Sequence, residues 1–282
     1  MEYKTLVCGS LVGTSSANFG IHLDKGSTSP STSVLEVARS IASGSSLNVQ
    51  VGSVSVGQAS DIITKQGNIQ YTVNGNRQFN VNGGNEGARV VYDSKLIEKC
   101  QEVKEELKNV SLALARKSAN NEVNFPRDQP GPLNLNVLKK DSDGIAVFSV
   151  PDGNALFNNQ KVQQIDIDNS RVQAALIVVN VGGKTVSFDS GNIVGSLTQL
   201  DTRSRVLFNF YEAEEINMQR NFMGTLLAPS AKVRTNANID GATVVKSLST
   251  TSELHKPLLV VPTCATTVTV TTQISRTSKL SA

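Results

Sequence analysis

The chain has 282 residues, a formal net charge of +3, 18% charged residues, 5% aromatic residues and no Trp. Its apolar content of 39% is too high, and its charge too low, for a disordered chain. No apolar run is long enough for a transmembrane helix. A charge of +3 over this length gives no electrostatic signature of a protein that binds duplex nucleic acid. The composition predicts a soluble, weakly charged and β-rich protein.

Before residue 93, short apolar runs alternate with Gly, Asn and Ser, a pattern typical of short strands joined by tight turns. Such runs occur at 47–51, 54–56, 69–73 and 79–81. Residues 33–42 have apolar positions at helical spacing, but they lie among predicted strands. We therefore expect a strand there as well.

The segment 93–117 has a different pattern, in which apolar residues recur at intervals of 4, 3, 4, 3 and 4 residues. This spacing places them on one stripe of an α-helix, which Asp93 or Ser94 is expected to cap. The stripe is too short for a long coiled coil, so we expect it to pack against its own chain. Cys100 lies on the stripe and is predicted to be a buried core thiol.

After residue 133 the short strands return, at 176–181, 206–210, 225–228 and 243–245. Gly224 and Gly241 begin similar strings 17 residues apart, and Val206 lies about the same distance before them. A period near 18 suits one coil of a β-helix. The predicted fold is mainly β: a β-solenoid with one long α-helix packed alongside. A β-sandwich is the alternative.

The predicted domain organisation is a single β-solenoid domain over residues 1–262, because the composition before residue 87 and after residue 133 is alike. Residues 120–132, which contain Pro, are expected to connect the helix to the later strands. Residues 263–282 are expected to form a C-terminal tail strand.

Several strings, in this order, resemble the choice-of-anchor A domain, which is related to the ice-binding-like β-solenoid fold. They are the strings at 3–13, 42–56, 65–84, 176–182, 205–210, 224–233, 239–248 and 253–255. The resemblance covers the chain to about residue 261. It implies a β-solenoid with one long helix along it, no known enzymatic activity, and display outside the cell on a C-terminal anchor. No leader or anchor motif is visible, so an intracellular or vacuolar assembly protein is an alternative to surface display.

Residues suited to catalysis are few. His22 and His255 are the only imidazoles, no Ser stands in a Gly-x-Ser-x-Gly context, and no Gly-rich phosphate loop is present. The sequence 141–144 is similar to the start of a calcium loop but lacks the later acidic ligand, so we expect a turn. The carboxylate pair at 214–215 is expected at a solvated corner. We predict no catalytic residues, cofactor or metal.

Self-association has the best physical argument, because the open ends of a β-solenoid carry unpaired backbone groups. The tail residues Thr267, Val268, Thr269, Val270 and Thr271 form an uncharged alternating strand that can add to the sheet of a neighbouring copy.

The cysteine count is odd, and Cys264 and Cys8 are the candidates for an intermolecular disulfide. Free thiols in a reducing compartment are the alternative.

The predicted function is therefore a non-enzymatic, self-assembling structural protein whose main partner is itself, with no nucleic acid and no membrane span. The alternative is a surface adhesin that binds matrix or glycan. Ice binding is a second alternative, but it needs aligned rows of small hydroxyl residues. Thr267, Thr269 and Thr271 form one such row without matching rows in the preceding coils.

Overall fold

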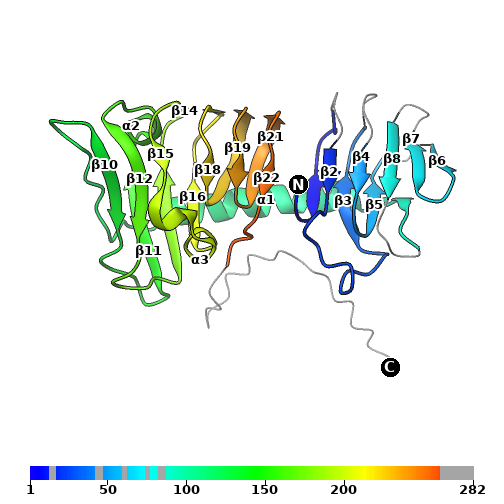
Figure 1. Ribbon diagram of the computed structural model, residues 1–282, viewed down its shortest axis with the longest axis horizontal. Coiled ribbons are helices and arrows are strands. Elements are labelled where there is room, and N and C mark those ends of the chain that lie inside the picture. Colours follow the sequence, from blue (N-terminus) through cyan, green and yellow to red (C-terminus); the bar gives the residue numbers. More distant parts are fainter. Residues whose placement is uncertain (13–16, 42–46, 59–61, 74–76, 82–86, 261–282) are drawn as a thin grey trace.

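The computed structural model describes residues 1–12, 17–41, 47–58, 62–73, 77–81 and 87–260. The chain is mainly β, and its strands form two stacks that lie side by side along one long helix, α1 (Leu96–Ala115) (Figure 1). The N-terminal stack comprises the described residues between 1 and 92, and the C-terminal stack comprises residues 131–255. The predicted division at residue 262 stays a prediction, because the tail lies outside the described residues.

The N-terminal stack consists of short strands. One parallel sheet has the order β1-β3-β5-β9, and a second sheet has the order β2-β4-β8-β7-β6. The strands are β1 (Thr5–Val7), β2 (Ala17–Phe19), β3 (Ser33–Val37), β4 (Leu47–Val49), β5 (Ser53–Val56), β6 (Ile63–Gln66), β7 (Gln70–Val73), β8 (Arg77–Val81) and β9 (Val90–Tyr92). The strand predicted within 33–42 is confirmed as β3. Pairing with β1 and β5 outweighs its helical spacing.

The C-terminal stack contains parallel strands of two to 11 residues and three short helices. The strands are β10 (Gly131–Asn136), β11 (Ile145–Val150), β12 (Val162–Asp168), β13 (Leu176–Val181), β14 (Thr185–Phe188), β15 (Asn192–Ile193), β16 (Val206–Asn209), β17 (Glu215–Met218), β18 (Phe222–Met223), β19 (Thr225–Thr235), β20 (Ile239–Asp240), β21 (Thr243–Thr250) and β22 (Leu254–His255). The helices are α2 (Gly153–Phe157), η1 (Gly195–Thr198) and α3 (Leu200–Arg203).

Successive strands of this stack surround one core on three sides. The helix side, formed by β11, β13, β16 and the first halves of β19 and β21, packs against α1. The polar side is formed by β14, β17 and the second halves of β19 and β21. The third side contains β10, β12 and β15, and then β18, β20 and β22. Parallel pairing around a core fits a β-solenoid, whereas a β-sandwich is built from antiparallel sheets.

Within the C-terminal stack, the predicted period near 18 holds only for the last coils. Leu207 pairs with Thr225, and Leu226 pairs with Thr243, at offsets of 18 and 17 residues. The offset is 29 residues between Ile177 and Val206, because η1 and α3 are inserted in that coil.

The glycines at the corners of the last coils allow the strands to stack closely. Gly224 has a φ of +112°, and a Cβ on Gly241 would overlap the carbonyl oxygen of Gly224.

The predicted helix is confirmed, and it joins the two stacks. Near its start, Leu96 and Cys100 are buried against the N-terminal stack. Near its end, Val110 and Leu114 pack on the helix side of the C-terminal stack. The N-cap is Lys95 rather than Asp93 or Ser94, and its side chain makes no capping bond. The carboxylate of Asp93 accepts the Lys95 N–H just before the helix, 3.0 Å away.

The prediction that Cys100 is a core thiol needs correction. Cys100 is buried, but it forms a disulfide with Cys8, which follows β1. The bond closes a sequence separation of 92 residues and attaches the start of α1 to the N-terminal stack.

Candidate functional site

The polar side of the C-terminal stack presents two outward rows of side chains. The strand register aligns Thr185, Glu215, Lys232 and Ser247 in one row, and Ser187, Asn217, Arg234 and Ser249 in the next. Between these rows the alternate residues Val186, Ile216, Val233 and Leu248 pack on the core, because successive strand residues point to opposite faces. The core therefore fixes the outward residues as a regular polar array.

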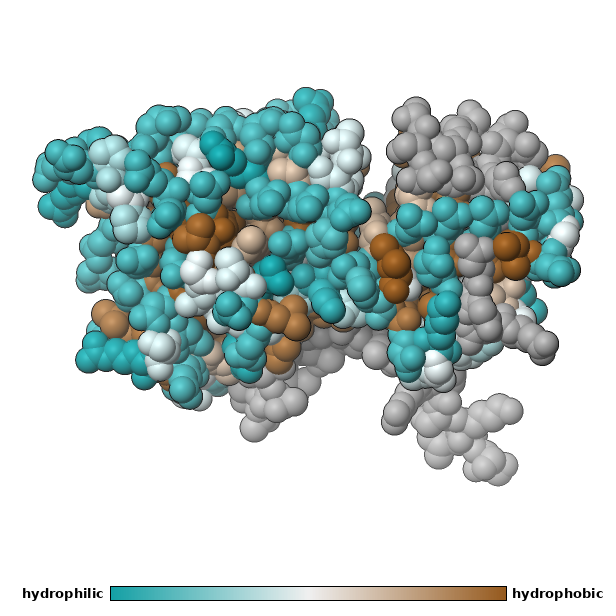
Figure 2. Space-filling view, viewed as in Figure 1, coloured by the Kyte–Doolittle hydropathy of each residue, from teal (hydrophilic) through white to brown (hydrophobic). Residues whose placement is uncertain are grey.

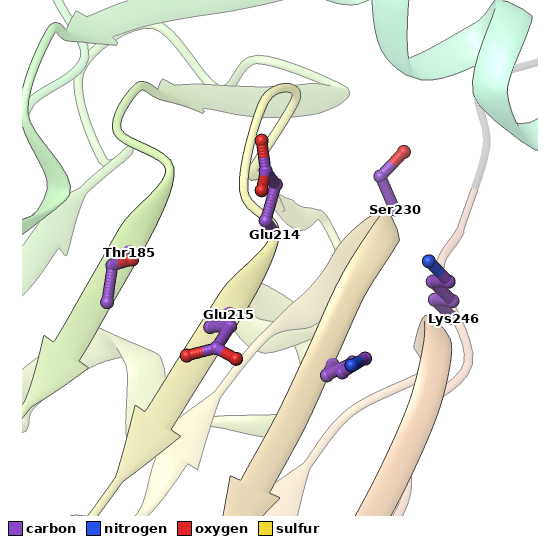
Figure 3. A pocket seen from close by; sticks show the side chains of 6 residues that line it. Thr185, Glu214, Glu215, Ser230 and Lys246 are labelled. Atoms are coloured by element: carbon purple, nitrogen blue, oxygen red, sulfur yellow. The ribbon is translucent and has the colours of Figure 1, made fainter.

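A hollow of about 390 Å³ lies on this side. It is lined by Thr185, Glu214, Glu215, Ser230, Lys232 and Lys246. Figure 3 shows the two glutamates on the β17 side of the hollow and Lys246 on the β21 side. The hollow therefore offers carboxylates, hydroxyls and ammonium groups to one ligand.

The charges are unevenly distributed across the polar side. Near β14, Lys184 and Glu214 form an exposed ion pair with an N–O distance of 3.0 Å. The hydrogen bond and the charge of Glu214 raise the pKa of Lys184. Lys232, Arg234 and Lys246 are exposed and form no ion pair with any described residue. The β19–β21 half of this side is therefore the basic half.

Only part of this site was foreseen from the sequence. Glu214 and Glu215 are exposed where β17 begins, as the predicted solvated corner requires. Lys232 and Lys246 were missed, because only the strand register brings them close to the glutamates. The alternation of Lys232, Val233 and Arg234 was the available signal, since it indicates a strand with two cations on one face.

The two histidines of the chain bind the same carboxylate, that of Glu2. His22 Nε2 and His255 Nδ1 lie 3.1 and 3.0 Å from Glu2 Oε1, and the backbone N–H of Lys256 donates to Oε2. Burial opposes ionisation of Glu2, but these hydrogen bonds and the histidine charges lower its pKa overall. This cluster connects the first residues of the chain to β22, and no described nucleophile lies among its contacts.

The turn predicted at 141–144 is present. The Asp141 carboxylate accepts the backbone N–H groups of Asp143 and Ile145 and pairs with Lys117 at 3.0 Å. Burial opposes ionisation of Asp141, but the Ile145 N–H and Lys117 lower its pKa overall. Within the described ranges, no group of three or more His, Cys, Asp or Glu residues is placed to hold a metal ion.

The predicted assembly residues have different outcomes. Cys264 and the strand from Thr267 to Thr271 lie outside the described residues, so their roles stay predictions. Cys8 is joined to Cys100 within the chain, so it is not free to link copies while that bond is present. Cys264 is then the remaining cysteine of the three.

The described strands do not present the surface expected for ice binding. Across three or more described strands, no row of register partners consists of Thr and Ser alone. Figure 2 shows one face of the molecule, on which hydrophobic side chains form small separate patches in a mainly hydrophilic surface.

Of the helices that the structure describes, none combines the length and the apolar character needed to cross a membrane.

Comparison with known proteins places these features in a family context. A family model described as "Putative Ice-binding-like adhesive domain" matches residues 1–256. No curated protein matches the chain. One similar solved structure is an ice-binding protein from the Antarctic ascomycete Antarctomyces psychrotrophicus, with 11% identity, a TM-score of 0.36, and coverage of 89% of this chain and 92% of that chain. Another is an ice binding protein from an Antarctic bacterium, Flavobacteriaceae, with 11% identity, a TM-score of 0.35, and coverage of 93% of this chain and 50% of that chain.

Proposed function

The chain belongs to this ice-binding-like adhesive domain family, and we propose that it is a non-enzymatic adhesive domain that binds a surface polymer through its polar side. The observation that carries the proposal is the array of two outward rows beside a hollow. An array of hydroxyl, amide and charged groups can donate hydrogen bonds to, and accept them from, the many hydroxyl groups of a matrix glycan. We also propose that the chain is related to the choice-of-anchor A domain and has the β-solenoid fold of that domain.

The polar side contrasts with the other outward surfaces of the same stack. On the third side, Arg203 of α3 forms an ion pair with Asp240 of β20 at 3.2 Å, so α3 lies against part of that side. The helix side is covered by α1. On the polar side, α2 contacts the edge of β14 through Asn154, while the row of Thr185, Glu215, Lys232 and Ser247 is exposed and accessible to an extended ligand.

The test is retention of the protein on surfaces coated with a panel of matrix polysaccharides. Asn217→Trp places a bulky side chain within the second outward row, and Asn136→Trp places the same side chain on the third side as a matched control. We expect Asn217→Trp to lower retention about tenfold and Asn136→Trp to leave it within about twofold. Equal retention of both variants would exclude the polar side, and absence of retention on every surface would reject the adhesive function.

Self-assembly is a second candidate, and one edge strand favours it. β10 is an edge of its sheet among the described strands, and in its second half, beyond Pro132, the outward side chains of Asn134 and Asn136 carry no charge. An uncharged edge is a template for an added strand. By contrast, Asn120 and Asn121 cover the edge of β11 through hydrogen bonds to Val147.

Assembly is tested by sedimentation of the full chain and of a variant that lacks residues 263–282. Loss of oligomers on truncation supports addition of the tail strand to a neighbouring sheet, and unchanged oligomers contradict it. Cys264→Ser tests the covalent link separately. A dimer band on a non-reducing gel must disappear in this variant if Cys264 joins two copies.

A further inference from the structure

The basic half of the polar side has the composition of an anion-binding surface. β19 and β21 contribute Lys232, Arg234 and Lys246 to it, and neither strand contains an Asp or Glu. All three cations are exposed. Glu215 is the register partner of Lys232 on β17, but no ion pair joins the two side chains. The three cations are therefore available to a negatively charged ligand.

The hollow adds a second kind of recognition. Its β17 wall contains Glu214 and Glu215, whose carboxylates accept hydrogen bonds and repel negative charge. The hydroxyls of Thr185 and Ser230 both donate and accept. A ligand that fills the hollow must therefore place hydroxyl groups against β17 and negative charge against β19 and β21. Sugar acids carry both groups on one ring.

The arrangement along β19 favours a polymer over a single sugar. Lys232 and Arg234 are two residues apart on one strand, so their Cα atoms are about 7 Å apart along it. Lys246 lies on the next strand, about 5 Å away laterally. Cations repeated in two directions match a chain that carries repeated negative charges. Arg also pairs with carboxylates in bidentate geometry.

Single-stranded nucleic acid is a poorer match to this surface. Non-specific binding of single strands relies on aromatic side chains that stack on the bases. The outward positions of β14, β17, β19 and β21 contain no aromatic residue. Glu214 and Glu215 would also lie close to a chain that has a phosphate on every unit.

We propose that Lys232, Arg234 and Lys246 bind a carboxylated polysaccharide, with its sugar hydroxyls directed to Glu214 and Glu215. This inference rests on the adhesive function proposed above and assigns its ligand class. Contacts between cations and carboxylates supply charge-assisted hydrogen bonds, and the glutamates select a hydroxyl-rich polymer over other polyanions.

The test uses the full chain and oligogalacturonate as the probe, with binding measured by isothermal titration calorimetry at low salt. The comparison ligands are a neutral galactan of similar length, a sulfated glycan and single-stranded DNA. We expect oligogalacturonate to bind most tightly, and its affinity to fall as salt rises, because the contacts are ionic. The double variant Lys232→Gln/Lys246→Gln should lose about tenfold in affinity.

Two control variants make the result specific. Lys232→Arg/Lys246→Arg keeps both charges and should retain affinity within about threefold. Lys104→Gln removes an exposed charge from α1, away from the polar side, and should change nothing. Tighter binding of DNA or of the sulfated glycan would overturn the assignment. Equal binding of the neutral galactan would also overturn it, while leaving the adhesive function in place.

Discussion

The two stacks share one helix but are stabilised in different ways. The core of the C-terminal stack contains six buried phenyl rings, and five of them form one cluster, with neighbouring ring centroids 4.8–6.4 Å apart: Phe157, Phe188, Phe208, Phe210 and Phe222. Its strands reach 11 residues in β19. Aromatic side chains bury large areas, and paired rings add to that stabilisation. This stack therefore has a substantial hydrophobic core of its own.

The N-terminal stack has a smaller hydrophobic core. In its β1-β3-β5-β9 sheet each strand has three to five residues. Ser53 is buried and bonds to the carbonyl of Pro30 and the N–H of Arg89. Asn80 donates to Asn48 on the neighbouring strand. Because short strands bury little apolar area, the disulfide to α1 and these bonds have a larger part in holding this stack.

The largest expected effect on stability comes from removing the Cys8–Cys100 disulfide, which should affect the two stacks unequally. Replacing both cysteines with Ser should lower stability by about 4 kcal/mol, because the bond closes a loop of roughly 90 residues. Hydrogen exchange should increase mainly in β1, β3 and β5, and much less in β13, β16 and β19. Cys264→Ser is the matched control and should leave both stacks unchanged. Equal destabilisation of the two stacks would contradict this comparison.

The sequence predicted those parts of the fold that depend on local pattern. The apolar stripe from Leu96 to Leu114 predicts α1, and the glycine strings at 224 and 241 predict coils that the register of β19 and β21 confirms. Contacts between distant residues were missed. Cys8 and Cys100, or Glu2 and His255, are brought together only by the stacking order of the whole chain.

The candidate binding site was less predictable than the fold, for the same reason. Glu214 and Glu215 are adjacent in sequence and were foreseen as exposed carboxylates. Lys232 and Lys246 lie close to them only because Glu215 pairs with Lys232, and Lys232 with Ser247. Lys232 follows the alternation of β19, so a slip of one residue in that strand would turn Lys232 away from the polar side, and the sequence alone does not specify the register.

An intermediate effect is expected at the contact between α1 and the C-terminal stack. Asn209 is fully buried and bonds to the side chain and carbonyl of Ser111 on α1, and to Asn180 on β13. Asn209→Ala should lower stability by about 2–3 kcal/mol, because it leaves the buried partners without hydrogen bonds. Asn217→Ala, at a half-exposed outward position, should stay within about 0.5 kcal/mol in denaturant unfolding. Similar losses in both variants would mean that the buried bonds contribute nothing specific.

The smallest expected effect concerns the contact between the two stacks at Glu2. Because the folded-state pKa of Glu2 is lowered, the stability from its ionised form is present above its unfolded pKa of about 4.5 and is lost as pH falls below that value. Glu2→Gln should therefore be less stable than the wild type at neutral pH, and the difference should shrink below about pH 4.5. Thermal unfolding of both proteins across this range measures it. Glu253→Gln, whose exposed carboxylate lies 3.1 Å from Nε2 of His255, should show a much smaller difference. A difference for Glu2→Gln that does not change with pH would show that the Glu2 contacts act through packing rather than through charge.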